Sequence, residues 1–204
     1  MPYLPRLLFL IGGVACLLYT VIAQPLAAGE KSGSPLQSRE LLLLLSRSEF
    51  QDPDRTNFDY LSLEFRHLVP LTNYWPNTRA LSPWTGLVGI YGAKPTADLG
   101  EWIAGGYAGV RYSFPSESNT PFYAQFNFGP QLTDAYKDRD QNVIGSFLEF
   151  RSELIFGKHW SLRQTPDRFL ITELNVQHIS NASLAERNVG VNNLGLAIGL
   201  SRFF

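Results

Sequence analysis

The sequence predicts an all-β protein, an eight-stranded antiparallel transmembrane β-barrel. Three observations support this fold. After residue 38, apolar residues recur with a period of two rather than 3.6. The polar face of the alternating segments carries opposite charges close together, as suits a narrow lumen, whereas the apolar face is rich in Leu and Phe. Each segment is about 10 to 14 residues long, which matches a tilted membrane strand.

The first 23 residues have the pattern of a secretory signal peptide. A weakly basic head over residues 1–6 precedes an apolar stretch over residues 7–22, and small or aliphatic residues lead to Ala23. A single membrane anchor is the alternative, but the stretch is slightly shorter than the roughly 20 apolar residues that a spanning helix needs. Cleavage after Ala23 removes Cys16, the one cysteine, so no thiol chemistry is left to the mature chain.

Residues 24–38 are polar and rich in Gly, Ser and Pro, which predicts a flexible lead-in before a barrel over residues 39–204. Removing the signal peptide takes away Arg6 as its one charge, so the formal net charge of −1 becomes −2. That balance gives no basic footprint for nucleic acid. About 180 residues remain, enough for one domain.

The alternation is clearest between residues 121 and 129, where Phe126 and Phe128 oppose Gln125 and Asn127. The weakest strand is the first, because the five leucines at 41–45 do not alternate. An even strand number places both termini in the periplasm and the loops near 49–56, 93–100, 134–142 and 181–191 outside the cell. Eight strands leave an interior that side chains just fill, so a transport pore is not expected. The expected strands are 39–48, 57–69, 84–92, 101–113, 121–133, 143–157, 168–180 and 192–204.

Three histidines could support chemistry, and one stands in an unusual position. We interpret His67, in a strand, and His159, near an expected periplasmic turn, as structural or interfacial. His178 and Ser180 lie two apart on one strand and project from the same apolar face. Polar groups facing lipid are costly and usually functional, and an imidazole beside a hydroxyl can form a base and its nucleophile. The alternative is that this strand end has left the hydrocarbon and meets water.

The residues around this pair extend the pattern. The chain reads His178-Ile179-Ser180-Asn181-Ala182, then Asn188-Val189-Gly190-Val191-Asn192, then a final strand. This resembles the C-terminal signature of the PagL family of lipid A 3-O-deacylases, which is H-x-S-N-(A/G), a short loop, N-x-G-(I/V)-E and a last strand. The sharp match covers about 15 residues, and a looser likeness in strand order extends over most of the mature chain.

The resemblance implies an outer-membrane barrel that hydrolyses the ester-linked acyl chain at position 3 of lipid A, with no cofactor or metal. Ser180 matches the nucleophile and His178 the general base. Asn188 matches the residue that helps to stabilise the oxyanion, and Asn181 and backbone N–H groups are further candidates. The implied partners are lipid A in lipopolysaccharide and the lipid of a Gram-negative outer membrane; a homodimer stays open.

One position departs from the family pattern. The acid that orients the histidine falls at Asn192, which carries no charge. An amide oxygen can accept a hydrogen bond from the imidazole, but in serine triads replacing the acid by its amide lowered turnover by about 10⁴. Three outcomes follow. Asn192 is enough to orient His178, or Glu186 in the loop takes the place of the missing acid, or the protein is a weakened or inactive relative.

Two other classes of function compete with the esterase. The first is a non-catalytic or weakly active barrel that braces the membrane or binds a surface partner, and Asn192 favours it. The second is a soluble secreted β-sandwich, whose strands also alternate. Neither accounts for His178 and Ser180 on the apolar face.

Overall fold

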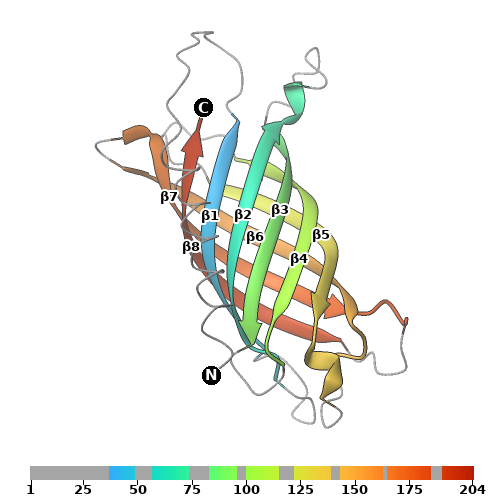
Figure 1. Ribbon diagram of the computed structural model, residues 1–204. Helices are drawn as coiled ribbons and strands as arrows, with labels where there is room; N and C mark the ends of the chain where they lie inside the picture. Colours follow the sequence, from blue (N-terminus) through green and yellow to red (C-terminus); the bar gives the residue numbers. More distant parts are fainter. Residues whose placement is uncertain are drawn as a thin grey trace.

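The computed structural model describes residues 37–48, 57–73, 83–95, 100–114, 122–138, 143–162, 165–184 and 190–204. Within them, eight antiparallel strands form a closed barrel in sequence order, with β8 paired to β1 (Figure 1). The strands are β1 (Ser38–Arg47), β2 (Tyr60–Pro70), β3 (Trp84–Pro95), β4 (Ile103–Ser113), β5 (Phe122–Thr133), β6 (Leu148–Leu162), β7 (Thr165–Ser180) and β8 (Val191–Phe203).

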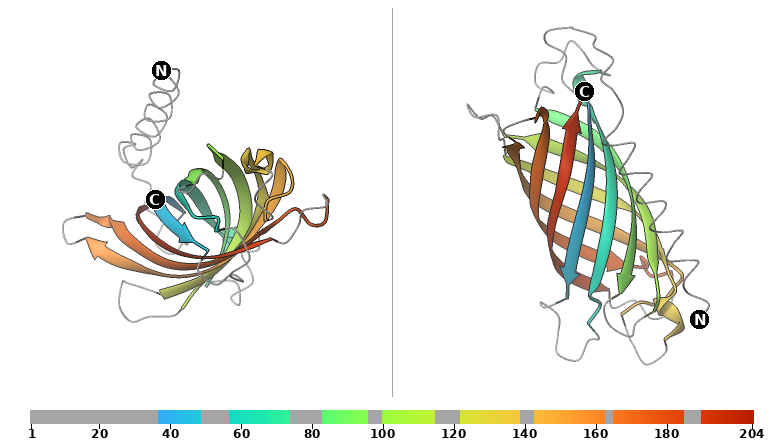
Figure 2. Two further views of the ribbon diagram at one scale, coloured as in Figure 1. Left: turned by 90° about the horizontal axis from the view of Figure 1, so that it is seen from below. Right: turned by 60° about the vertical axis from the view of Figure 1, so that its left-hand side comes forward.

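Closure leaves no edge strand with unpaired backbone groups, which is the condition for a β-structure to cross a membrane. Figure 2 shows the barrel and its tilted strands from two further sides. The C-terminus lies beside the start of β1, because the N–H of Phe204 donates to the carbonyl of Gln37 at 3.0 Å. Short 3-10 turns, Leu71–Asn73 and Ala135–Lys137, follow β2 and β5. Within the described residues, no helix is long and apolar enough to cross a membrane.

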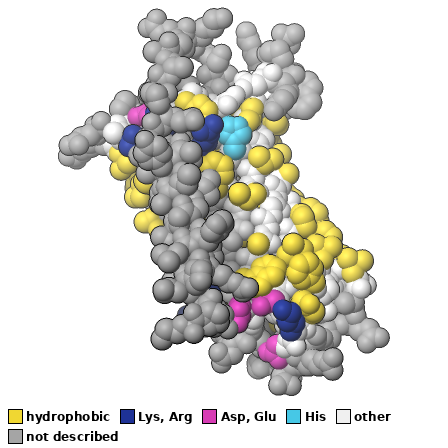
Figure 3. Space-filling view, in the orientation of Figure 1, with side chains coloured by type: hydrophobic (Ala, Val, Ile, Leu, Met, Phe, Trp, Pro, Cys, Tyr) yellow, Lys and Arg dark blue, Asp and Glu magenta, His cyan; other side chains and the backbone are white. Residues whose placement is uncertain are grey.

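The outer wall is apolar, as the alternation predicted. Phe126 and Phe128 are 50% and 53% exposed, whereas Gln125 and Asn127 between and beside them are buried. On the face seen in Figure 3, hydrophobic side chains cover much of the middle of the wall and charged side chains lie toward its two ends. Such a band suits contact with the hydrocarbon of a bilayer.

The lumen is filled by paired charges, also as expected. Arg66 is fully buried and binds both carboxylate oxygens of Glu173 and one oxygen of Glu64. Arg111 binds Glu40 through two contacts of 2.5 and 2.7 Å. Bidentate pairing of this kind offsets much of the desolvation that buried charges require.

The five leucines of β1 alternate in environment although they do not alternate in type. Leu42 and Leu44 are buried in the lumen, whereas Leu43 and Leu45 are 46% and 47% exposed. The neighbouring strand β8 has a glycine where the buried leucines need space, because a Cβ on Gly195 would lie 2.7 Å from Leu44 Cδ1. An apolar stretch of lumen beside β8 therefore explains why β1 lacks the polar alternation of the other strands.

Seven strands begin and end within three residues of the expected bounds, but the prediction for the sixth was wrong. It was expected over 143–157, and β6 instead spans Leu148–Leu162. Val143 and Ile144 are buried outside any strand, so their apolar character reflects packing of the preceding segment. His159 consequently lies within β6, three residues before the strand ends, with its side chain buried. The expected signal peptide at 1–23, and the lead-in up to residue 36, lie outside the described residues.

Candidate active site

Two polar side chains occupy the outward face of β7 at its C-terminal end. Alternation along the strand directs His178 and Ser180 outward, while Ile179 between them is fully buried. His178 is exposed and Ser180 is half-buried. They continue the outward row of Leu174 and Val176, which are 41% and 49% exposed. The imidazole and the hydroxyl therefore border the apolar outer wall.

The imidazole of His178 is held from the neighbouring strand. Asn192 is the β8 residue paired with His178, and its Oδ1 lies 2.8 Å from His178 Nδ1. An amide oxygen only accepts hydrogen bonds, so this contact places the proton on Nδ1. The opposite nitrogen, Nε2, is then the acceptor, which is the form of histidine that takes a proton from a serine hydroxyl.

Gly190, just before β8, closes one side of the imidazole. Its φ of +73° is in the left-handed region that side chains rarely adopt. A Cβ there would lie 3.0 Å from His178 Cε1 and 3.5 Å from Nε2. A side chain at position 190 would therefore crowd the imidazole, and glycine leaves the ring the space that it occupies.

A tight turn follows Ser180. Ala182 and Ser183 both have positive φ, 52° and 65°, and the N–H of Leu184 donates to the carbonyl of Asn181 at 3.0 Å. Two positive φ values at the centre of such a turn define type I′, a conformation that costs non-glycine residues about 1–3 kcal/mol each. Strain of this kind is found most often at functional sites, so its position directly after Ser180 supports a site there.

Apolar side chains continue the surface beside the pair. Phe150 on β6 lies opposite Ser180 in the strand register and stacks on Phe128, with ring centroids 5.9 Å apart. Leu154 lies four residues further along β6, opposite Val176, and is 43% exposed. Ser180 therefore has apolar side chains beside it on the outer wall.

The remaining predicted residues are placed differently. The side chain of Asn181 is fully buried, so it does not share the exposed face of His178. Asn188 and Glu186 lie outside the described residues. In the described part of the chain, no group of three His, Cys, Asp or Glu side chains could hold a metal ion.

Ala182 and Gly190 stand in the matched motif, but the sequence reasoning assigned no role to Gly190 or to a turn at Ala182 and Ser183. Gly190 could have been recognised as a glycine directly before a strand, a position that often requires a positive φ. The turn had no such signal, because neither Ala nor Ser favours a positive φ. The contribution of Phe150 depends on the register between β6 and β7, which the misplaced sixth strand obscured.

Comparison with known proteins gives a family and a fold. A sequence model of the family described as "Lipid A 3-O-deacylase (PagL)" matches residues 60–201, from the start of β2 into β8. The crystal structure of the outer membrane enzyme PagL is 14% identical, with 78% of this chain and 97% of that chain covered and a TM-score of 0.55. Neisserial surface protein A is 12% identical, with 83% and 96% covered and a TM-score of 0.54. At these identities the two structures establish the barrel fold alone. No curated protein matches the chain by sequence.

Proposed function

Because the chain belongs to the lipid A 3-O-deacylase (PagL) family, we propose that this outer-membrane barrel is a serine esterase that removes the 3-O-linked acyl chain of lipid A. One observation carries the proposal: His178 and Ser180 share an exposed, apolar face, and Asn192 holds the imidazole at 2.8 Å in the form that can act as a base. A barrel with a purely structural role has no need of that arrangement.

The proposed reaction proceeds in two steps. Ser180 Oγ attacks the ester carbonyl carbon while its proton passes to His178 Nε2, and collapse of the tetrahedral intermediate releases the lipid A hydroxyl, which takes that proton. Water then attacks the acyl-enzyme, with His178 again accepting and returning a proton. The products are a free fatty acid, 3-O-deacylated lipid A and regenerated Ser180.

The negative charge on the intermediate needs donors close to Ser180. We assign Asn188 to this role from its place in the family motif. The buried side chain of Asn181 argues against its own amide as a donor. Backbone N–H groups of the turn at Ala182 and Ser183 are the further candidates, because that turn begins directly after the nucleophile.

The acyl chain would be held by the outer wall rather than by an enclosed pocket. Phe150, Phe128 and Leu154 provide an apolar strip that begins at Ser180 and continues toward the middle of the barrel. Burial of a methylene contributes about 0.8 kcal/mol, so a chain of ordinary length has enough apolar contact to position its ester group.

Asn192 favours a second candidate, a non-catalytic or weakly active member of the family. An amide cannot stabilise by charge the imidazolium that forms when Ser180 loses its proton. Such a protein would keep the barrel and the apolar wall and act through its surface.

Mass spectrometry of lipid A distinguishes the two candidates. Cells of a Gram-negative host that express the protein should contain lipid A lacking the 3-O-linked acyl chain, and cells without it should not. Unchanged lipid A, together with a barrel correctly assembled in the outer membrane, would exclude the esterase and leave the non-catalytic candidate.

A further inference from the structure

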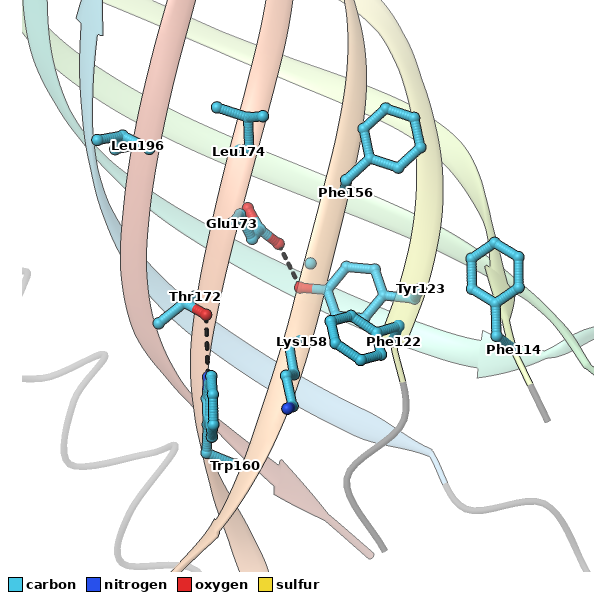
Figure 4. Close-up of a pocket in the computed structure, with 11 residues that line it drawn as sticks. Phe114, Phe122, Tyr123, Phe156, Lys158, Trp160, Thr172, Glu173, Leu174 and Leu196 are labelled. Carbon is cyan, nitrogen blue, oxygen red and sulfur yellow. Dashed lines mark hydrogen bonds between the residues drawn. The ribbon is translucent and has the colours of Figure 1, made fainter. Parts of the chain in front are cut away.

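A hollow lies on the outer wall, toward the end of β7 opposite Ser180. It crosses β5 to β8 and encloses about 530 Å³. We call it the β5–β8 groove (Figure 4). Its lining is mostly apolar and outward-facing, and includes Phe114, Phe122, Phe156, Trp160, Leu174 and Leu196.

Two polar side chains meet in the groove. Lys158 on β6 and Thr172 on β7 are directly paired in the strand register. The Lys158 ammonium lies 4.0 Å from the ring centroid of Trp160 and 4.6 Å from that of Phe122. Two aromatic faces therefore hold the cation at the groove. Trp160 is itself fixed, because its Nε1–H donates to Thr172 Oγ1 at 2.9 Å, which leaves the threonine hydroxyl proton free to donate elsewhere.

No carboxylate among the described residues pairs with Lys158. Glu173 also lines the groove, but its charge is directed into the lumen, where Arg66 and the hydroxyl of Tyr123 bind it. Figure 4 shows the contact between Tyr123 and Glu173 behind the outer wall. The groove thus presents an unneutralised cation and a hydroxyl donor beside an apolar hollow.

The groove lies in the leaflet opposite the candidate active site. Thr172 and Ser180 are eight residues apart on β7, which corresponds to about 26 Å along the strand. A strand tilt of about 40° leaves roughly 20 Å along the barrel axis, most of the apolar band of about 25 Å. Lys158 and Thr172 therefore lie near the opposite edge of the apolar band from Ser180.

We infer that the β5–β8 groove binds one glycerophospholipid of the periplasmic leaflet, with its phosphate at Lys158 and Thr172 and an acyl chain in the hollow. Charge complementarity selects this occupant, because a phosphate supplies the anion that Lys158 lacks and several oxygens that can accept from Thr172. An aromatic and cationic cluster at this depth also matches the interfacial level of a membrane protein, where headgroups meet hydrocarbon.

Native mass spectrometry of the folded barrel tests this inference with dioleoyl phosphatidylglycerol as the probe. The wild-type protein, equilibrated with the lipid in detergent micelles, should retain one phospholipid. Lys158→Gln should lower the retained fraction about fivefold, because one cation near a lipid headgroup contributes about 1 kcal/mol. Lys94→Gln is the matched control. Lys94 is an exposed lysine near the C-terminal end of β3, a strand that does not line the groove, so its loss should not affect retention.

Two further arms separate the parts of the inference. Thr172→Phe fills the hollow without changing any charge and should also reduce retention. Dioleoylglycerol, which has the same chains and no phosphate, should be retained poorly. Equal retention by wild type and Lys158→Gln would mean that the Lys158 ammonium is solvated by water at the membrane interface and does not bind the phosphate. That result would overturn the proposal. Equal retention of dioleoylglycerol, or an equal loss in Lys94→Gln, would overturn it as well. None of these measurements depends on ester hydrolysis.

Discussion

His178 Nδ1 and Asn192 Oδ1 lie 2.8 Å apart, between two strands whose register pairs these residues directly. The amide therefore occupies the position from which an acid would orient the imidazole. It supplies the geometry of a histidine–carboxylate pair without the charge. The first two predictions test whether this hydrogen bond, without a negative charge, is enough to support hydrolysis.

Asn192→Asp should raise the rate of deacylation by about tenfold or more. Aspartate has nearly the shape of asparagine, so a carboxylate oxygen would replace Oδ1 at the same distance from Nδ1. A charge there stabilises the imidazolium of the transition state more than the neutral ground state. Rates on purified lipid A measure the effect, and Asn192→Ala, which removes the contact, should lower the rate. A rate that is unchanged or lower in Asn192→Asp would mean that the amide is an adequate partner.

Glu186→Gln should leave at least half of the wild-type activity. The Nδ1 atom of His178 already has Asn192 as its partner, so no second acceptor is needed to orient the ring. The same assay on lipid A checks this expectation. A collapse of activity in Glu186→Gln would assign the orienting role to that loop carboxylate instead.

Gly190→Ala should lower activity by about tenfold to a hundredfold while the barrel still assembles. The added Cβ would press on His178 Cε1 at 3.0 Å, and displacing a catalytic group by about 1 Å can lower the rate about 10²-fold. Gly92→Ala is the matched control, because no atom lies within 4 Å of a Cβ at that position. Wild-type activity in Gly190→Ala would show that the close approach of this backbone does not position the ring.

Arg66→Met should lower the free energy of unfolding by about 3–5 kcal/mol, because it removes the nearest cation from the buried Glu173 and one of the two arginines that bind the buried Glu64. Unfolding by urea in lipid vesicles, followed by tryptophan fluorescence, measures the change. The pair of Arg47 and Asp59 serves as the control, since it is separated by 3.6 Å and Arg47 is 58% exposed. Arg47→Met should change stability by less than about 1 kcal/mol. Similar effects of both substitutions would contradict the view that the lumen network holds the barrel.

Much of the fold was predictable because the period of two reports directly which side chains face lipid. Phe126 and Gln125 were assigned to opposite faces from the sequence, and their exposures agree. The sixth strand was misplaced because Val143 and Ile144 are apolar for a different reason, which is their burial in the segment before β6. Hydrophobicity alone does not distinguish the two environments.

The candidate site was predictable only in part. Strand parity placed His178 and Asn192 on one face, and the register brings them into hydrogen-bond contact. Parity cannot give the backbone angles of Gly190 and Ala182, because these depend on how the turns close. Nor could it reveal the β5–β8 groove, which arises from side chains on four neighbouring strands.

The most direct test of the account is the mass of lipid A after incubation with purified wild-type, Ser180→Ala and Ser183→Ala proteins. Ser183 is an exposed serine in the turn after β7, so its variant controls for the loss of a nearby hydroxyl. We expect loss of the 3-O-linked acyl chain with wild type and with Ser183→Ala, and a rate at least about 10³-fold lower with Ser180→Ala. Deacylation by Ser180→Ala at the wild-type rate would contradict the assignment of Ser180 as the nucleophile.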